Sequence, residues 1–288
     1  MDNTLLTFFN QTLANPFLDI VMLSFTLVAP GVLFGVGFAS LVGKQRRIGF
    51  AILIALACGL ALTMLFQFTV LRPRPDAVRL IWPTPNFPSY PSGHAVAAFA
   101  TATVIALAYR RHWGVVALIA AGLTALSRVT LGHHYPSDIV AGSILGAGIG
   151  AACYGLMVTG DSGPNRWRWL LWPQIALVVV ITQMAYLDLI PAAIFIWPYT
   201  DKVMHFILFG AVVFWLNIWW SGRIMRRGRW AIPLAIIVPL AIAATEEGLQ
   251  TFSPLRTASL GDLSCDVMGM MVFWWMSQRI LNVKLTYR

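Results

Sequence analysis

Nine apolar runs, each long enough to cross a bilayer as a helix, constrain this sequence more than any other feature. A bilayer core takes about 20 residues of helix, and backbone polar groups inside it must be satisfied within the segment. Charged residues make up only 11% of the 288 positions, against about 25% in soluble proteins. We therefore predict an all-α integral membrane protein, a polytopic helical bundle of about nine transmembrane helices. The runs lie at residues 17–42, 48–71, 92–108, 114–131, 139–158, 169–187, 203–220, 231–245 and 263–280.

Clusters of basic residues fall at every second loop, and this placement predicts how the chain is oriented. Cytoplasmic loops of membrane proteins carry an excess of lysine and arginine. The net charge of +9 therefore reflects topology, and no nucleic-acid partner is expected. We expect the N-terminus outside and the C-terminus in the cytoplasm. The clusters lie within residues 44–47, 110–111, 166–168, 223–229 and 279–288.

The polar stretch at residues 161–168, which contains Gly163 and Pro164, is the best boundary in the chain. Glycine and proline between apolar segments are typical of loops. The halves on either side carry different motifs and show no convincing internal repeat. We therefore predict a fusion of two membrane domains, residues 1–160 and residues 168–288.

Polar residues also gather at the predicted outer ends of the first five spans, where the orientation rule gives no reason for them. They belong to different spans but to one membrane face, which indicates a common site. Between two of these spans, residues 72–91 hold six prolines, so an irregular segment is expected there. Three pieces stand out in order: Arg74-Pro75, then Pro91-Ser92-Gly93-His94, then Ser127-Arg128 followed by His134 and Asp138.

These residue types suit phosphoryl transfer. Negative charge on the phosphoryl oxygens is stabilised by fixed guanidinium groups and backbone amides, and Arg74 and Arg128 supply the guanidinium groups. Ser92 and Gly93 open a predicted helix whose N-terminal amides and dipole favour an anion. The pattern therefore predicts a phosphate site.

Two histidines can divide the chemistry. A neutral imidazole attacks phosphorus and forms a phosphohistidine, while a protonated one gives its proton to the leaving oxygen. We assign the attack to His134, because Asp138 lies one helical turn further on and can hold one ring nitrogen. His94 is then the acid, next to the anion-binding amides.

The three pieces resemble the signature of the type 2 phosphatidic acid phosphatase superfamily: Lys, six residues, Arg-Pro; Pro-Ser-Gly-His; and Ser-Arg, five residues, His, three residues, Asp. The match covers residues 67–138 directly, and we expect it to extend over residues 1–160. The resemblance implies that His134 is the nucleophile, that Asp138 is the partner of His134, and that His94 is the proton donor. It also implies the phosphate binders Arg74, Ser92, Gly93 and Arg128.

One position departs from that signature. Gln67 stands where the family has lysine, and it can donate a hydrogen bond but carries no charge. We expect weaker phosphate affinity or an altered substrate choice, with Arg72 or Arg79 as the residues able to compensate.

Three other readings of these residues stay open. His133, His134 and Asp138 together could ligate a metal, but two nearby arginines would repel a cation, so no metal or other cofactor is expected. His133 is read as a polar neighbour. A lipid or ion transporter is a second reading, and a non-catalytic lipid-binding protein is a third.

The second half carries its own polar residues at the predicted outer ends of its spans. Such residues are expensive in hydrocarbon and imply pairing with one another or with a polar ligand. The set resembles the VanZ-like family, with Asp266 where that family has asparagine. We leave open whether it is a headgroup-binding pocket or a network that only fixes helix packing. The candidate residues are Asp201, Lys202, His205, Glu247, Gln250, Arg256 and Asp262.

Together these features predict an integral membrane lipid phosphatase, independent of metal, at the outer face of a bacterial inner membrane. The site would face the periplasm or the cell exterior. Undecaprenyl pyrophosphate is the leading substrate, because a VanZ-like partner suggests cell-envelope chemistry. Transfer of the phosphoryl group to a lipid acceptor such as lipid A is the alternative. The expected partners are the lipid substrate and the bilayer, and the sequence does not identify a protein partner.

Overall fold

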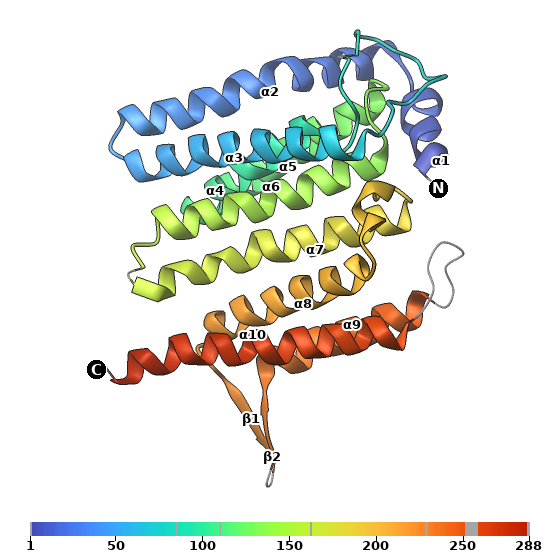
Figure 1. Ribbon diagram of the computed structural model, residues 1–288. Helices are drawn as coiled ribbons and strands as arrows, with labels where there is room; N and C mark the ends of the chain where they lie inside the picture. The colour runs from blue at the N-terminus through green and yellow to red at the C-terminus, as the bar shows by residue number, and fades with distance from the viewer. Residues whose placement is uncertain are drawn as a thin grey trace. The chain divides into compact units, whose positions relative to one another are not determined.

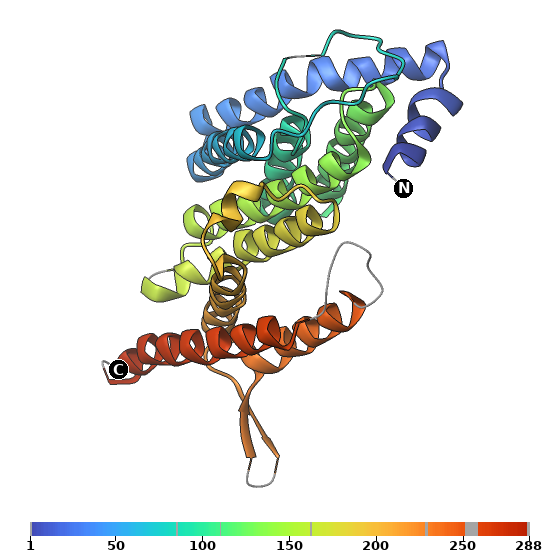
Figure 2. The same cartoon turned by 45° about the vertical axis from the view of Figure 1, so that its right-hand side comes forward.

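The computed structural model describes residues 2–84, 86–109, 111–161, 163–227, 230–250 and 259–286. The chain divides into two compact units, Met1–Gly160 and Asp161–Arg288. Figures 1 and 2 show both, in blue to green and in yellow to red. Arg256, a candidate of the second half, lies outside the described residues, as do Arg110, Arg229 and Arg288 from the basic clusters.

The first unit is a bundle whose longer helices run side by side (Figure 1). The second helix begins where the Asn15 side chain accepts a hydrogen bond from the Leu18 amide at 2.8 Å and Pro16 occupies the first turn. The elements of the first unit are α1 (Asp2–Thr7), a π-helical turn (Phe8–Thr12), α2 (Pro16–Val42), α3 (Arg46–Val70), α4 (Gly93–Ala108), α5 (Arg111–Thr130) and α6 (Pro136–Met157).

A row of glycines on α6 brings α4 into close contact. A Cβ atom at Gly142, Gly146 or Gly150 would lie 2.3 to 2.6 Å from a backbone oxygen of α4, so no side chain fits there. Small residues on one helix face allow backbones to approach closely in membranes. Because α4 begins with Gly93 and α6 carries Asp138, this packing fixes two pieces of the predicted site against each other.

The long connection from α3 to α4 has no regular helix or strand in its described residues, as its prolines predict. The N-terminal segment holds it in place. Asn10 donates from Nδ2 to the carbonyl oxygens of Arg79 and Thr130, each at 2.9 Å. Arg79 in turn pairs with both carboxylate oxygens of Asp19 at 2.7 and 2.8 Å. The loop is therefore fixed over the end of the bundle.

The second unit packs around α8 and α10, whose buried contacts include Val213, Leu216 and Met270. Gly269 lets α10 approach α8, because a Cβ there would lie 2.1 Å from the Phe206 carbonyl oxygen. The elements of the second unit are a 3₁₀ segment (Gly163–Leu170), α7 (Leu171–Tyr186), a second 3₁₀ segment (Ala192–Ile196), α8 (Thr200–Trp219), β1 (Ile224–Arg227), β2 (Trp230–Pro233), α9 (Leu234–Gln250) and α10 (Leu260–Thr286).

A two-stranded hairpin is the main departure from the all-α prediction. Strands β1 and β2 pair antiparallel, with Ile224 opposite Pro233 and Arg227 opposite Trp230. The predicted span at residues 231–245 is therefore wrong at its start, because α9 begins only at Leu234. The apolar residues before it belong to a strand that needs a pairing partner, and hydropathy alone does not reveal such a partner.

Six helical segments of the described chain are long and apolar enough to cross a membrane, which supports a helical membrane protein. They are α2, α3, α5, α6, Arg166–Tyr186 and α8, whereas α4 is apolar but shorter. The count of nine spans is therefore not established by length and composition.

Candidate active site

The predicted phosphate-site residues meet at one end of the first unit. The α3–α4 loop, the turn between α5 and α6, and α1 all lie at that end (Figures 1 and 2). Tyr135 precedes α6, and its amide donates to Asp138 Oδ2 at 3.0 Å, while Pro136 occupies the first turn. This capping box starts α6 at a fixed place and fixes Asp138 in its first turn.

Asp138 is fully buried and lies between a guanidinium group and an imidazole. Its Oδ1 accepts a hydrogen bond from Arg72 Nη1 at 2.6 Å. Its Oδ2 lies 3.4 Å from His134 Nδ1, which is an ion-pair distance without hydrogen-bond alignment. Arg72 also donates to Ser137 and to Asp2 of α1 and lies over the Tyr135 ring.

Arg74 faces the other side of the same imidazole. Its Nη1 donates to His134 Nε2 at 3.2 Å and to the His133 carbonyl oxygen at 2.8 Å. Its Nε donates to the Phe87 carbonyl oxygen at 2.7 Å. Arginine has no acceptor, so His134 Nε2 carries a lone pair and Nδ1 carries the hydrogen that faces Asp138.

Burial and charge keep this imidazole neutral. Burial lowers the pKa of His134, and the carboxylate of Asp138 only partly offsets that effect. The guanidinium groups of Arg74 and Arg128 lower it further. A buried neutral imidazole whose Nε2 carries a lone pair has the form that a nucleophile requires once a substrate phosphate draws Arg74 away from that nitrogen.

Arg128 is held by Thr26, which the sequence did not single out, and by His133, which the sequence suggested only as a polar neighbour. Its Nη1 donates to Thr26 Oγ1 of α2 at 3.1 Å, and its Nη2 donates to His133 Nδ1. His133 Nε2 donates to the Trp82 carbonyl oxygen at 2.8 Å, so both ring nitrogens are engaged. Burial, together with the charge of Arg128, lowers the pKa of His133 to about 4. Neutral His133 thus positions Arg128, and no part of its ring is free to bind a metal.

The start of α4 supplies a polar group without a partner. Ser92 is fully buried, its amide donates to the Asp138 carbonyl oxygen at 3.1 Å, and its Oγ has no hydrogen-bond partner among the described residues. Buried hydroxyls are rarely left unpaired, which favours a ligand at this point. Gly93 has no side chain to cover this point, and a Cβ there would be in van der Waals contact with Thr63 Cγ2 at 3.4 Å.

His94 and Gln67 complete the predicted set. His94 is half-buried, and Arg74, Arg128 and His134 act on it electrostatically, so the two histidines lie in the same site. Gln67, on the last turn of α3, donates to the Pro91 carbonyl oxygen at 3.3 Å. Arg72 and Arg79, the residues proposed to compensate for its missing charge, are each paired with carboxylates.

In the second unit, the described candidates form paired clusters. Lys202 donates to Asp201 at 3.0 Å and to Asp262 at 2.9 Å. His205 Nδ1 lies 3.0 Å from Asp266, and Glu247 accepts from the Ser259 amide. Gln250 donates to both carboxylate oxygens of Glu246. In the part of the chain that is described, no group of three or more His, Cys, Asp or Glu residues has a metal-binding arrangement.

The geometry of the first unit agrees with a comparison to protein families. Residues 47–160 match the PAP2 superfamily. For this region the match confirms the resemblance seen in the sequence, and the region contains every predicted phosphate-site residue from Gln67 to Asp138. No comparison supports a VanZ-like assignment of residues 168–288.

Curated relatives match part of the chain. An undecaprenyl-diphosphatase from Sulfolobus acidocaldarius is 31% identical over 110 residues, which are 37% of this chain and 53% of that protein. A decaprenylphosphoryl-5-phosphoribose phosphatase from Mycobacterium tuberculosis is 40% identical over 94 residues, 32% and 51% respectively. The chain thus spans about half the length of these relatives. The crystal structure of Aquifex aeolicus LpxE aligns with a TM-score of 0.48 at 24% identity, over 53% of this chain and 93% of that one.

Proposed function

We propose that this protein is an integral membrane lipid phosphatase that removes phosphate from a lipid phosphate or pyrophosphate through a phosphohistidine. The observation that carries the proposal is the contact between Arg74 Nη1 and His134 Nε2, 3.2 Å apart. It joins an anion-binding group to the nitrogen that would attack phosphorus. The match of residues 47–160 to the PAP2 superfamily supports the same chemistry.

In the first step His134 Nε2 attacks phosphorus, and the bond from phosphorus to the leaving oxygen breaks. In the absence of substrate, Arg74 donates a hydrogen bond to that nitrogen. When the phosphoryl group binds, we expect Arg74 to donate to a phosphoryl oxygen instead, which frees the nitrogen for the attack. The hydrogen on His134 Nδ1 faces Asp138, which stabilises the positive charge that the ring acquires. Water then hydrolyses the phosphohistidine and releases inorganic phosphate.

The transferring group would be stabilised by fixed dipoles and charges. Arg74 and Arg128 supply positive charge, and the Ser92 hydroxyl and the amides at the start of α4 supply hydrogen bonds. Because these groups are held by the protein before the substrate binds, they need little reorganisation in the transition state.

His94 is the proposed acid of the first step and base of the second. The groups that act on it electrostatically are Arg74, Arg128 and the two other histidines of the site, all cationic when charged. A proton on His94 is therefore balanced by the phosphate anion of the substrate. We infer that His94 takes up its proton with the bound lipid phosphate and hands it to the leaving oxygen.

We propose nine spans, with the N-terminus outside, the C-terminus in the cytoplasm and the site at the outer face of a bacterial inner membrane. Lys44, Arg46 and Arg47 lie at the turn between α2 and α3, at the opposite end of α3 from Gln67. An excess of basic residues is typical of the cytoplasmic side. The phosphate site would then face the periplasm or the cell exterior.

Prenyl pyrophosphates, with undecaprenyl pyrophosphate first, are the proposed substrates. Two of the matched relatives are named for substrates that carry a polyprenyl chain, which supports this choice. We also propose that residues 1–160 form the phosphatase domain and residues 168–288 a VanZ-like domain. The second assignment rests on its sequence pattern alone.

A phosphate-release assay tests the function. Purified full-length protein is given undecaprenyl pyrophosphate, phosphatidic acid, phosphatidylglycerol phosphate and lipid A, each with EDTA present. We expect phosphate release from the prenyl substrate, loss of release in His134→Ala, and normal release in the control His112→Ala at the far end of α5. Full activity in His134→Ala would overturn the mechanism. Phosphate release only when EDTA is left out would overturn the metal independence of the enzyme. Phosphate recovered on a second lipid would show that the phosphoryl group is transferred to a lipid acceptor and not to water.

A further inference from the structure

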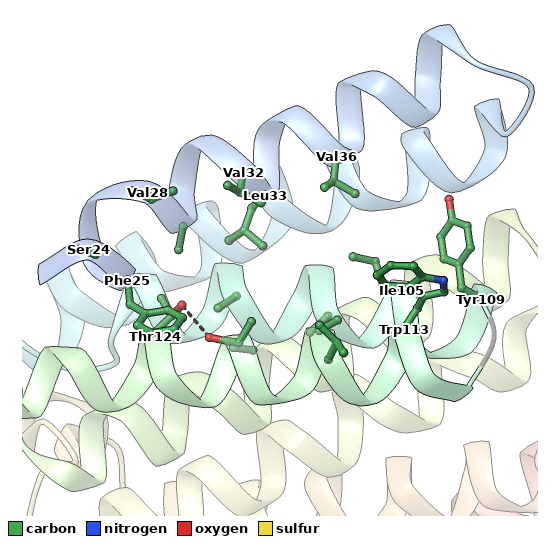
Figure 3. Close-up of a pocket in the computed structure, with 17 residues that line it drawn as sticks. Ser24, Phe25, Val28, Val32, Leu33, Val36, Ile105, Tyr109, Trp113 and Thr124 are labelled. Carbon is green, nitrogen blue, oxygen red and sulfur yellow. Dashed lines mark hydrogen bonds between the residues drawn. The ribbon is translucent and has the colours of Figure 1, made fainter. Parts of the chain in front are cut away.

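An apolar groove of about 680 Å³ runs along the first unit between α2 and the pair formed by α4 and α5. Figure 3 shows Phe25 and Thr124 at one end, Tyr109 and Trp113 at the other, and Leu33 between them. The polar side-chain atoms of its lining are confined to its two ends, at Ser24 and Thr124 and at Tyr109 and Trp113. A pocket of this size is in the range of sites for small ligands.

Alanines on two helices create the space. Ala98 and Ala102 of α4 and Ala117, Ala120 and Ala121 of α5 all line the groove. Opposite them, α2 contributes larger side chains. A wall of methyl groups faced by branched side chains suits a flexible hydrocarbon chain, which is held by dispersion and by removal of apolar surface from contact with water.

One end of the groove is continuous with the phosphate site. Phe25 is followed by Thr26, whose Oγ1 accepts from Arg128 Nη1 at 3.1 Å and lies 2.7 Å from Ser127 Oγ. Thr124 lies one helical turn before Arg128, and its carbonyl oxygen accepts from Ser127 Oγ at 2.7 Å. The residues that hold the guanidinium group thus adjoin the residues that end the groove.

We propose that this groove binds the first part of the substrate's prenyl chain, with the phosphate held at Arg128. The proposal rests on the proposed phosphatase function and adds where the chain lies and how much of it is bound. From Phe25 to Val36 on α2, or from Thr124 to Trp113 on α5, the helix rises about 17 Å. An extended chain advances about 1.2 Å per bond, so the groove takes roughly fourteen bonds, or three to four isoprene units.

The test is a chain-length series with one headgroup: geranyl, farnesyl and geranylgeranyl pyrophosphate, followed by longer prenyl pyrophosphates. Phosphate release by the full-length protein gives a KM for each prenyl pyrophosphate. We expect the KM to fall as units are added and to level off after about three to four of them, because further units leave the groove. A KM that does not depend on chain length while geranyl pyrophosphate is turned over would overturn the groove assignment. No release from any of these substrates would overturn the phosphatase function itself.

Ala117→Phe is the blocking variant, and its matched control is Ile119→Phe. Ile119 lies on the same helix, is well exposed and does not line the groove. With Ala117→Phe we expect the KM for geranylgeranyl pyrophosphate to rise about tenfold, the loss of roughly two methylene contacts, and that for geranyl pyrophosphate to stay unchanged. Equal chain-length profiles for the two variants would contradict the proposal.

A second variant acts in the opposite direction. Trp113 closes the far end and is largely exposed, so Trp113→Ala lengthens the groove with little risk to folding. We expect the levelling point of the KM series to move to longer chains by about one isoprene unit. If bilayer lipid rather than substrate filled the groove, neither variant would shift the series, and the proposal would fail.

Discussion

Asp138 lies closer to Arg72 than to His134. Its Oδ1 is 2.6 Å from Arg72 Nη1, whereas its Oδ2 is 3.4 Å from His134 Nδ1. The carboxylate that orients the imidazole is therefore itself held by a guanidinium group, and Asp2 of α1 holds that group from the other side at 2.8 Å. Both carboxylates outweigh burial and raise the pKa of Arg72, so its charge is permanent.

This relationship predicts the pH dependence of turnover. His134 attacks as a neutral ring, so activity falls as pH drops through its pKa. Because burial lowers that pKa from its usual 6.5, we expect the acidic limb of kcat/KM in the wild-type protein below pH 6.5. A limb above pH 6.5 would show that His134 is more easily protonated than its burial implies.

Arg72→Gln should move the same limb to higher pH. Without the guanidinium group, Asp138 acts on His134 alone and favours its protonated form, so the pKa of His134 rises. We also expect a drop in kcat/KM of about tenfold at neutral pH, as is typical when the partner of a catalytic group is lost. The control is Arg79→Gln, which removes the same charge from the same loop but breaks only the pair with Asp19 and the hydrogen bond to the Asn10 carbonyl oxygen. Identical pH profiles in the two variants would argue against the role of Arg72.

His133 should act through Arg128. In His133→Ala the guanidinium group loses the acceptor on one of its nitrogens, so we expect phosphate and vanadate to bind about tenfold more weakly. His133→Asn can restore an acceptor and should recover part of the loss. The measurement is inhibition of turnover by vanadate. Unchanged inhibition in His133→Ala, with normal folding, would mean that His133 only packs.

Gln67→Lys tests the position that departs from the superfamily signature. Gln67 already lies beside Pro91 and Ser92, so a lysine there would add charge close to the phosphate. We expect a KM lowered about threefold to tenfold, within the usual net range of one hydrogen bond. Gln67→Met, which is uncharged and of similar size, should raise the KM instead. The same KM in all three proteins would place this side chain outside the phosphate site.

The paired clusters of the second unit favour a structural network over a headgroup pocket. Asp262→Ala leaves Lys202 with Asp201 alone, so we expect the melting temperature in detergent to fall by a few degrees, with phosphate release per folded protein unchanged. Asp161→Ala breaks a more exposed pair with Arg168 and should change the melting temperature less. A changed lipid preference in Asp262→Ala would support the pocket instead.

The helices were predictable because apolar runs of bilayer length have few alternatives, and each predicted run overlaps a helix of the described chain. The hairpin was not predictable from the sequence, because strands β1 and β2 are stabilised by pairing with each other and no local sequence pattern marks either strand. The predicted phosphate residues do lie together at one end of the first unit. Their assigned roles stay predictions.

The supporting residues could not be predicted, since their contacts join distant parts of the chain. Asp2 binds Arg72 and Ser137, and Thr26 binds Arg128, across 70 to 135 positions. The motif led to Arg74, which contacts His134, and passed over Arg72, which pairs with Asp138. The groove was also invisible in the sequence, because alanines on α4 and α5 create a space only once α2 covers them.

The most direct test of the account is to find the phosphoryl group on His134. Wild-type protein and His94→Ala are mixed with prenyl pyrophosphate, quenched in base and digested, and the peptide containing His134 is examined for acid-labile phosphate. We expect the label on His134, at a higher level in His94→Ala, because the phosphate leaving group of a pyrophosphate needs little help from an acid, whereas hydrolysis of the intermediate loses its base. Release of inorganic phosphate with no label on His134, or with the label at another residue, would contradict the account.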